Sequence, residues 1–364
     1  MDFDLDDDQQ AISDLAGRIL ADRCAPDRLR EHETSGAPFA ADAWAELAKA
    51  DLLGVALPES VGGGGYGALE AALIAEQVGR HVAPVPYAET LAAAMLLADA
   101  AAGEHADLLA AVIGGDAVLA VAIDEPAVDP SGGPATVAAA DGDGWLLTGT
   151  KSPVRWAAEA TATLAIAAAD DGEGVFLVAA GAAGVTITTE QAMWGLPLAT
   201  VELAGAPAVR VGDAGAADQL RRLATALSCA TVSGVCEGAL RITAAYVSER
   251  EQFGTKIGTF QAVGQRMADA YIDTEAIRLT TRQGAWRLAS GLPVDDELHI
   301  AKFWAADGAH RVVHAAQHLH GGVGLDLDFP IHRYFRWAKV LELQLGSGTE
   351  HLRALGASIA ASPA

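Results

Sequence analysis

Apolar residues recur with two different spacings along this chain, and the order of those spacings limits the folds it can adopt. Up to residue 115, and again from residue 217, they return every three or four positions, which predicts amphipathic helices. Between residues 116 and 208, short apolar runs are separated by Gly and Asp, which predicts strands. We therefore expect an α+β protein with an N-terminal α-helical domain (1–115), a middle β domain (116–208) and a C-terminal helical domain (217–364).

The pattern also suggests where the individual elements lie. Helices are expected over 6–20, 43–53, 69–78 and 90–102, and then over 220–250, 267–288, 298–319 and 347–360. Apolar runs at 117–123, 145–151, 163–168, 175–179 and 185–189 predict short strands of a small barrel or sandwich. Residues 207–216 follow neither pattern and are expected to form a linker.

Charge and cysteine content narrow the class of ligand and compartment. The chain has 24 Lys and Arg against 48 Asp and Glu, a net charge of -24, which excludes a nucleic-acid-binding protein. An anionic ligand would need local positive groups. The three scattered cysteines, Cys24, Cys229 and Cys236, fit a reducing compartment better than a disulfide framework. The acidic N-terminus is no signal peptide, and no long uncharged apolar run predicts a membrane span, so we expect a cytoplasmic protein.

A loop at residues 249–263 combines an unusual set of side chains between two predicted helices. Gly254 and Gly258 interrupt the helical pattern, and Arg250, Gln252 and Phe253 lie within four positions. A guanidinium suits a phosphate, an amide suits the edge of a heterocycle, and a phenyl ring suits its face. The alternative interpretation is an ordinary, solvated helix connection.

Three segments occur in the order and at the distances found in one known family. They are 250–263, 320–324 followed by Asp328, Pro330 and Arg336, and 53–59 followed by four glycines and Tyr66. In these segments the chain resembles the acyl-CoA dehydrogenases over nearly its whole length. The resemblance implies a helical domain, a β domain and a four-helix bundle. It also implies FAD chemistry, in which a Glu removes the α-proton of an acyl-CoA thioester and flavin takes the β-hydride.

The resemblance also implies that the usual general base is missing. The family usually carries its Glu just before a Gly-Thr pair, and here Ser347 stands in that position. Some members carry the base at the start of the preceding long helix, where this chain has Ala224 and Thr225. A relocated base among the neighbouring carboxylates, Glu237, Glu342 and Glu350, stays open as an alternative. We expect no catalytic residue in this chain.

The flavin-contacting segments of the β domain also depart from the family pattern. The first reads Asp124-Glu125-Pro126-Ala127-Val128-Asp129, so the usual Thr has become Asp124 and both glycines are lost. In the second, Pro153 replaces a Trp and Arg155 replaces a Thr. A carboxylate beside the pyrimidine edge would repel reduced, anionic flavin. These departures argue against a flavin ring bound in this chain.

The segments that family dimers extend across their interface are retained. By resemblance, they hold the pyrophosphate and adenine of the flavin whose ring lies in the neighbouring chain. The residues expected to bind the cofactor in this way are Arg250, Gln252, Phe253, Gln261, His318, Gly321 and Gly322. His318 fills the position usually taken by Gln, while Gln317 lies one residue early. His310, His314 and His318 share a helix face, but no third-ligand motif accompanies them, so we expect no metal site.

Within the family, the chain looks most like the non-catalytic subunit of actinobacterial heterotetrameric dehydrogenases. Their substrates are steroid side-chain acyl-CoA thioesters, and two such chains pair with two homologous catalytic chains that share the FAD. The resemblance implies an electron-transfer flavoprotein or similar acceptor. Two alternatives stay open: a self-sufficient homotetrameric dehydrogenase with a relocated base, and a dehydrogenase-fold scaffold without flavin.

Overall fold

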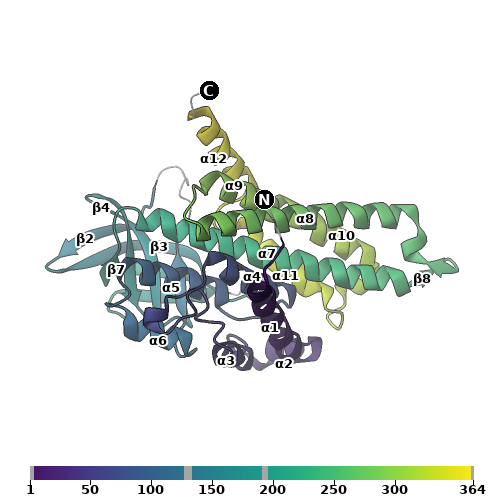
Figure 1. Ribbon diagram of the computed structural model, residues 1–364, viewed down its shortest axis with the longest axis horizontal. Coiled ribbons are helices and arrows are strands. Elements are labelled where there is room, and N and C mark those ends of the chain that lie inside the picture. The colour runs from purple at the N-terminus through teal and green to yellow at the C-terminus, as the bar shows by residue number, and fades with distance from the viewer. Residues whose placement is uncertain (1–3, 127–132, 191–195, 362–364) are drawn as a thin grey trace.

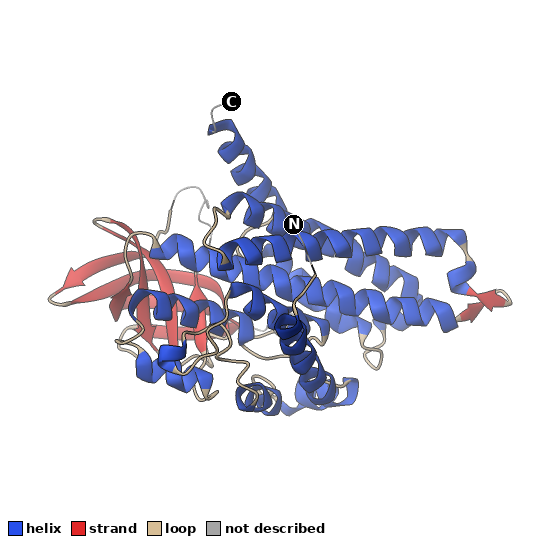
Figure 2. Ribbon diagram, in the orientation of Figure 1, coloured by secondary structure: helices blue, strands red, loops and turns tan. Residues whose placement is uncertain are grey.

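The three predicted parts are all present, with the strands at one end and the N-terminal helices packed against the long C-terminal helices (Figures 1 and 2). A computed structural model describes residues 4–126, 133–190 and 196–361. Strands gather at one end, long helices form the rest, and a small hairpin lies at the far end (Figure 2). This arrangement confirms the α+β fold. The substituted segment 127–129 lies outside the described residues.

The N-terminal part is helical, and its last helices are the most deeply buried. Asp6 and Gln9 form a capping box that begins the first helix. Nearly all of α4 and most of α5 are buried, whereas α1 buries only Ser13, Ala16 and Leu20. Two short helices, α2 and α6, were not predicted. The elements are α1 (Asp7–Arg23), α2 (Pro26–Ser35), α3 (Ala41–Lys49), η1 (Glu59–Val61), α4 (Ala68–Arg80), α5 (Tyr87–Ala101) and α6 (Ala106–Ile113).

The middle part is a seven-stranded sheet that closes on itself. Its order is β1-β4-β2-β3-β7-β5, with β6 paired to β7, and β5 also pairs with β4. This second pairing closes five strands into a barrel, which removes most of their free edges. The strands are β1 (Leu119–Ala122), β2 (Val137–Asp141), β3 (Gly144–Arg155), β4 (Ala162–Ala169), β5 (Gly172–Ala179), β6 (Val185–Glu190) and β7 (Leu198–Val211).

The linker expected at residues 207–216 is wrong in its first half, because β7 continues through Pro207 to Val211. Pro207 pairs with Leu146 of β3 on one side. On its other side, β6 pairs with β7 only up to Leu203 and β5 only from Val209. Pro207 therefore has a partner strand on one side only, which is the edge-like position where proline is tolerated in a sheet.

The C-terminal part is a helical bundle with an irregular third helix and one unpredicted helix. A π-turn, η4, interrupts the helix expected over 298–319, and α11 was not predicted. The elements are α7 (Ala216–Glu249), β8 (Glu251–Gln252), β9 (Thr255–Lys256), η3 (Ile257–Thr259), α8 (Gln261–Ala289), α9 (Asp295–Phe303), η4 (Trp304–Gly308), α10 (Ala309–His320), η5 (Gly321–Leu325), α11 (Ile331–Leu343) and α12 (Gly348–Ala361).

Helix α7 is the central helix of the molecule. It crosses α4 so closely that a Cβ on Gly79 would lie 1.8 Å from the Thr231 carbonyl oxygen, and one on Gly234 would lie 1.8 Å from that of Glu76. Only glycines permit this approach. Among the described helices, α7 alone is long and apolar enough to span a membrane, but 89% of that window is buried inside the protein. It is a core helix.

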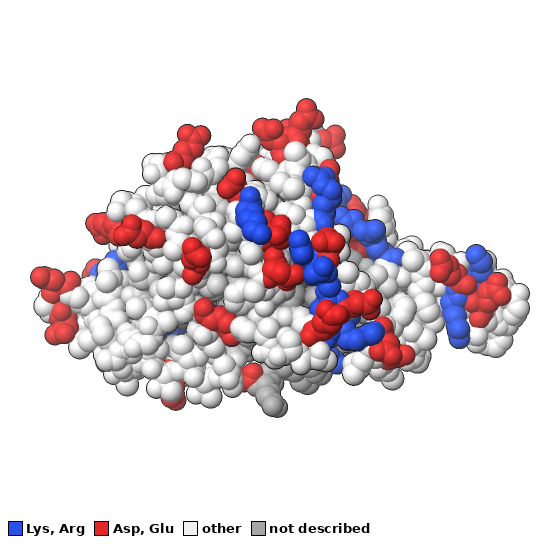
Figure 3. Space-filling view, turned by 90° about the horizontal axis from the view of Figure 1, so that it is seen from below, with Lys and Arg blue, Asp and Glu red and all other residues white. Residues whose placement is uncertain are grey.

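The charge is unevenly distributed over the surface. Figure 3 shows one face, on which Asp and Glu are scattered while most Lys and Arg lie in a central band and a smaller group lies at one end, both with acidic side chains among them. This face therefore presents no broad basic surface.

Candidate functional site

A cavity of about 820 Å³ lies between the β domain and the helical bundle. Its walls come from the ends of β1 and β3, the first turns of α7, α9, the loop after α11, and α12. Three positions where the sequence analysis looked for catalytic and flavin-contacting groups line it, Asp124, Pro153 and Thr225. The fourth, Ser347, follows Leu345 and Gly346, which line the cavity. The fold thus brings together segments that are far apart in the chain.

The loop after α11, which contains the Ser347 position, is held by side chains from several elements. The Leu345 amide donates to the Asp124 carboxylate at 3.0 Å, and His351 Nε2 donates to the Leu345 carbonyl at 2.8 Å. Leu345 has φ 60° and Gly346 has φ 94°, so the chain turns sharply here. Buried Lys302 donates to the carbonyls of Leu341 and Glu342 at the end of α11.

Ser347 itself begins helix α12. Its Oγ accepts from the Glu350 amide at 3.4 Å, while the Glu350 carboxylate accepts from the Ser347 amide at 2.5 Å. This reciprocal pair is a capping box. The backbone hydrogen bond is the main cause that lowers the Glu350 pKa. The residue in the usual base position therefore has a structural role.

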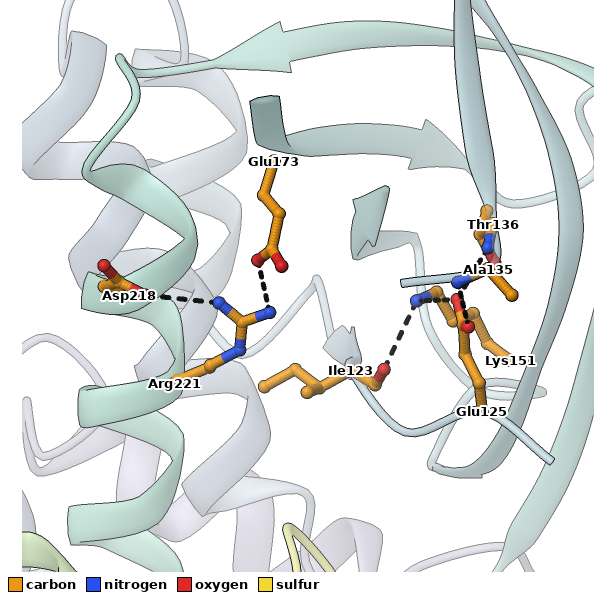
Figure 4. A network of polar contacts seen from close by, with 8 residues as sticks. All are labelled: Ile123, Glu125, Ala135, Thr136, Lys151, Glu173, Asp218 and Arg221. Atoms are coloured by element: carbon orange, nitrogen blue, oxygen red, sulfur yellow. Dashed lines mark hydrogen bonds and ion pairs between the residues drawn. The ribbon is translucent and has the colours of Figure 1, made fainter. Parts of the chain in front are cut away.

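Asp124 and Glu125, at the end of β1, have different environments. Burial raises the Asp124 pKa, and the hydrogen bond from Leu345 only partly opposes this. Burial also disfavours ionised Glu125, but Lys151 at 2.6 Å and the amides of Ala135 and Thr136 outweigh it and lower its pKa (Figure 4). Glu125 and Lys151 form a satisfied buried ion pair.

Arg155 fills space beside the cavity rather than leaving it for a ligand. Its Nη1 lies 3.0 Å from the Glu89 carboxylate of α5 and donates to Gln344 at 3.3 Å. Both side chains of the ion pair are less than a tenth exposed. Burial lowers the Arg155 pKa, and Glu89 opposes this shift. The position that carries a small hydroxyl in the family pattern here joins β3, α5 and the loop after α11.

The two arginines of the cavity wall are already paired with carboxylates. Arg221 contacts Glu173 at 2.5 Å and Asp218 at 3.3 Å (Figure 4). Arg222 contacts Asp295 at 2.6 Å. Asp124, Glu125, Asp296 and Glu350 add to the acidic lining. The cavity therefore offers a phosphate-bearing ligand little free positive charge.

The second predicted site lies at the opposite end of α7 from the cavity (Figure 1). Arg250 ends α7, and its chain continues into the β8–β9 hairpin, where Phe253 is 94% exposed with φ 54°. The Phe253 and Phe260 rings meet edge to face at 6.3 Å. Arg250, Gln252 and the first residue of α8, Gln261, are all exposed.

The His-Gly-Gly segment lies beside this hairpin. Tyr246, one turn before Arg250, stacks on His320 with ring centroids 4.4 Å apart. Exposed His318 meets Arg266 at 2.7 Å through Nδ1, and since a guanidinium only donates, Nε2 of His318 carries its proton. Gly321 has φ 57°, and a Cβ on it or on Gly322 would meet open space. The structure thus brings the seven predicted cofactor-binding residues to one end of the bundle.

Two family models match this chain, one over its N-terminal helical part and one over its C-terminal helical part. The model of the acyl-CoA dehydrogenase N-terminal domain matches residues 6–116, and that of the C-terminal domain matches residues 216–360. The chain belongs to the acyl-CoA dehydrogenase family. It is 40% identical to acyl-CoA dehydrogenase FadE27 of Mycobacterium tuberculosis, with both chains covered completely.

Two solved structures of dehydrogenase complexes are also similar. The ChsE4-ChsE5 complex from Mycobacterium tuberculosis matches with TM-score 0.95 and 40% identity over all of both chains. A variant of the Tcur3481-Tcur3483 steroid ACAD matches with TM-score 0.93 and 42% identity over 97% of this chain and 98% of that one. The sequence-based family assignment is confirmed, and so is the resemblance to heteromeric steroid dehydrogenase subunits.

Two features of this acyl-CoA dehydrogenase family member escaped the sequence analysis. The Ser347–Glu350 capping box could have been found from its Ser-x-x-Glu spacing. The Arg155–Glu89 pair could not, because its members lie 66 positions apart and no local pattern joins them. Among the described residues, no cluster of His, Cys, Asp or Glu could hold a metal. His310 instead stacks near His314 and meets Glu342 at 3.3 Å.

Proposed function

We propose that this chain is the non-catalytic subunit of an FAD-dependent acyl-CoA dehydrogenase that introduces an α,β double bond into an acyl-CoA thioester. Its partner is a homologous catalytic chain, two of each forming a heterotetramer. This subunit contributes the hairpin end of its bundle to the partner's FAD site. The observation that carries the proposal is the capping role of Ser347 at the usual position of the base.

The nearby carboxylates are engaged in other contacts, which supports the absence of a base. Glu237 pairs with Arg80 at 2.8 Å, and Glu342 pairs with Lys339 at 2.5 Å. Glu350 accepts from the Ser347 amide. A general base must reach the substrate α-carbon with a free lone pair, and a displacement of about an ångström is already costly.

The residues of the cavity do not fit a flavin ring. Asp124 places a buried carboxyl at the end of β1, and Arg155 with Glu89 forms an ion pair beside the wall. Two atoms of this ion pair, Arg155 Nε and one Glu89 carboxylate oxygen, have no hydrogen-bond partner, but both are buried. This lining supports a ring site in the partner rather than in this chain.

The hairpin end does fit the phosphate and adenine parts of FAD, which as a bound group would supply the hydride acceptor in the partner. Arg250 can donate two hydrogen bonds to phosphate oxygens, and Phe253 can cover a heterocycle. Residues 225 and 250 are roughly 38 Å apart along α7 at 1.5 Å per residue. One dinucleotide cannot reach both the cavity and the hairpin of the same chain, which supports sharing between chains.

Substrate, acceptor and location follow from the relatives as part of the same proposal. One similar structure is named a steroid ACAD, and another is a complex of two differently named chains. We infer a steroid side-chain acyl-CoA as substrate and an electron-transfer flavoprotein or similar protein as acceptor. The three free, buried cysteines support a reducing cytoplasm.

The test is to purify the chain alone and together with its homologous catalytic chain. Alone, it should be nearly colourless and partly aggregated, because it has half a flavin site. Together, the two chains should give a complex with about one flavin per pair of chains, measured by visible absorbance and native mass. A yellow homotetramer with one flavin per chain would refute the proposal.

A further inference from the structure

The exposed side chain of His318, on the last turn of α10, is held by an arginine of the neighbouring helix. Arg266, in the second turn of α8, lies with its Nη1 at 2.7 Å from His318 Nδ1. Since a guanidinium has five N–H donors and no acceptor, Nδ1 of His318 is the acceptor and carries no proton. The contact therefore fixes both the orientation of the ring and its tautomer, and it leaves the Nε2–H of His318 as a hydrogen-bond donor.

Arg266 differs from the other arginines of α8 in the group that it contacts. Arg278, Arg282 and Arg287 each contact a glutamate. In the part of the chain that the structure describes, neither Arg266 nor Arg250 contacts a carboxylate, although Asp and Glu outnumber Lys and Arg by 48 to 24. The guanidinium of Arg266 thus orients an imidazole at the hairpin end of the bundle instead of neutralising an acidic side chain.

The imidazole of His318 can make fewer kinds of hydrogen bond than the Gln that usually stands at this position. A Gln side chain has an acceptor oxygen and an NH2 donor, and it can turn either of them to a ligand. An imidazole whose Nδ1 is engaged by Arg266 can present only its Nε2–H. The ligand atom that faces His318 is therefore an acceptor, such as a phosphate oxygen or a ring nitrogen of adenine, and not the amino group of adenine.

We propose that Arg266 is a positioning residue for the partner's FAD. It holds His318 so that Nε2–H donates to an acceptor atom in the adenosine diphosphate half of the cofactor. Both roles rest on the proposed function, in which this end of the bundle contributes to the partner's FAD site. Arg266 acts through the imidazole, so its effect on FAD binding depends on the presence of His318.

The test is a double-mutant cycle on the complex with the homologous catalytic chain, from which flavin is removed and FAD is titrated back. Arg266→Met should weaken FAD binding about threefold to tenfold, the scale of ordering one free side chain on binding. In a His318→Ala background, Arg266→Met should have no further effect. Equal losses in both backgrounds would overturn the proposal, because Arg266 would then bind FAD directly.

His318→Asn distinguishes a donor at Nε2 from a contact that only supports the fold. The Asn amide oxygen can still accept from Arg266, but the shorter side chain has no donor at the place of Nε2. His318→Asn should therefore bind FAD as weakly as His318→Ala. Arg266→Lys, whose ammonium can still donate to Nδ1, should keep most of the affinity. Wild-type FAD affinity in His318→Asn would overturn the assignment of His318 as a donor.

The matched control for the lost positive charge is Arg18→Met, at an exposed position of α1, which should bind FAD like the wild type. Because Arg266 and His318 are exposed, their variants should keep the native mass and the unfolding temperature of the complex. An FAD affinity that falls only together with the unfolding temperature would overturn the positioning role.

Arg250→Ala separates the positioning role of Arg266 from the proposed function. If Arg250→Ala depletes the complex of flavin while Arg266→Met and His318→Asn bind FAD like the wild type, only the positioning role is overturned. If none of the three variants changes FAD binding, the hairpin end does not hold the cofactor, and the proposed function fails with it.

Discussion

Ser347 and Glu350 cap helix α12 reciprocally: each side chain accepts from the other's backbone amide. In the acyl-CoA dehydrogenase family, the position of Ser347 usually holds the base. In this chain that position instead stabilises a helix beginning, and the loop before it is fixed by Asp124 and His351. We propose that the loop serves the fold where a catalytic relative carries its base.

Ser347→Ala should lower the free energy of unfolding by about 1 kcal/mol, because the cap hydrogen bond is lost. Thr349→Ala, at an exposed position of the same turn, should change it much less. Urea unfolding measures both. Ser347→Glu should not give the isolated chain dehydrogenase activity, because Asp124, Pro153 and Arg155 remain. Activity in that variant would show that only the base was missing.

Removing carboxylates singly from the complex should leave turnover within a few-fold of wild type. The variants are Glu237→Gln, Glu342→Gln, Glu350→Gln and Asp124→Asn, the last chosen because burial raises the Asp124 pKa as for a proton-transfer group. Steady-state rates with acyl-CoA measure the effect. A loss of about 10³ at any one position, the scale of a general base, would identify a relocated base in this chain.

Arg155→Ala should destabilise the chain by about 3–5 kcal/mol, because it leaves the buried Glu89 carboxylate without its cation. Arg155→Met combined with Glu89→Leu removes both charges and should be much less destabilising than the single change. Chemical unfolding of the wild type, Arg155→Met, Glu89→Leu and the double variant measures the coupling. A double variant whose effect equals the sum of the two single effects would mean that the two residues act independently.

Arg250→Ala should lower the affinity of the complex for FAD about tenfold or more, since each charge-assisted hydrogen bond contributes roughly 1.5–3 kcal/mol. Arg250→Lys should bind FAD almost as weakly as Arg250→Ala, because an ammonium cannot donate two parallel hydrogen bonds to a phosphate as a guanidinium does. Added FAD should recover much of the rate. Lys256→Ala, on the same hairpin, is the control. If Arg250→Ala leaves the flavin content unchanged, the loop only connects two helices and does not bind the cofactor.

The docking of α12 should weaken as the pH falls below 6.5. His299 and His351 meet at 2.9 Å through Nδ1, and one proton joins the two neutral rings. Burial lowers both pKa values, that of His351 to about 4, although Asp295 and Glu350 oppose the shifts. The unfolded chain then binds more protons, so this stability is present above pH 6.5 and is lost towards pH 4.

Hydrogen exchange of α12 between pH 7 and pH 4.5 measures this effect. The double variant His299→Asn with His351→Gln should flatten the response of α12. A wild-type α12 with constant protection across this range would contradict the prediction.

The sequence alone determined the order of helices and strands and the family, and it predicts the loss of the base. Spacing of apolar residues reports which side of a helix or strand is buried, and the motifs around Arg250 and His320 are local enough to be read directly. Ser347 was visible as a substitution for the same reason. Helix α11 was not predicted, because it buries His332 and Arg333 together with its apolar residues and so lacks a clean apolar spacing.

Only the tertiary structure decided what the substituted residues do. Pro207 fits within β7 because it lies between the stretch that pairs with β6 and the stretch that pairs with β5. No local sequence pattern reveals this gap. Arg155 contacts Glu89 and Gln344, which lie far from it in the sequence. Only the packing of β3 against α5 and the end of α11 brings these residues together. The length of α7 separates the cavity from the exposed hairpin, and that separation supports a flavin shared between two chains.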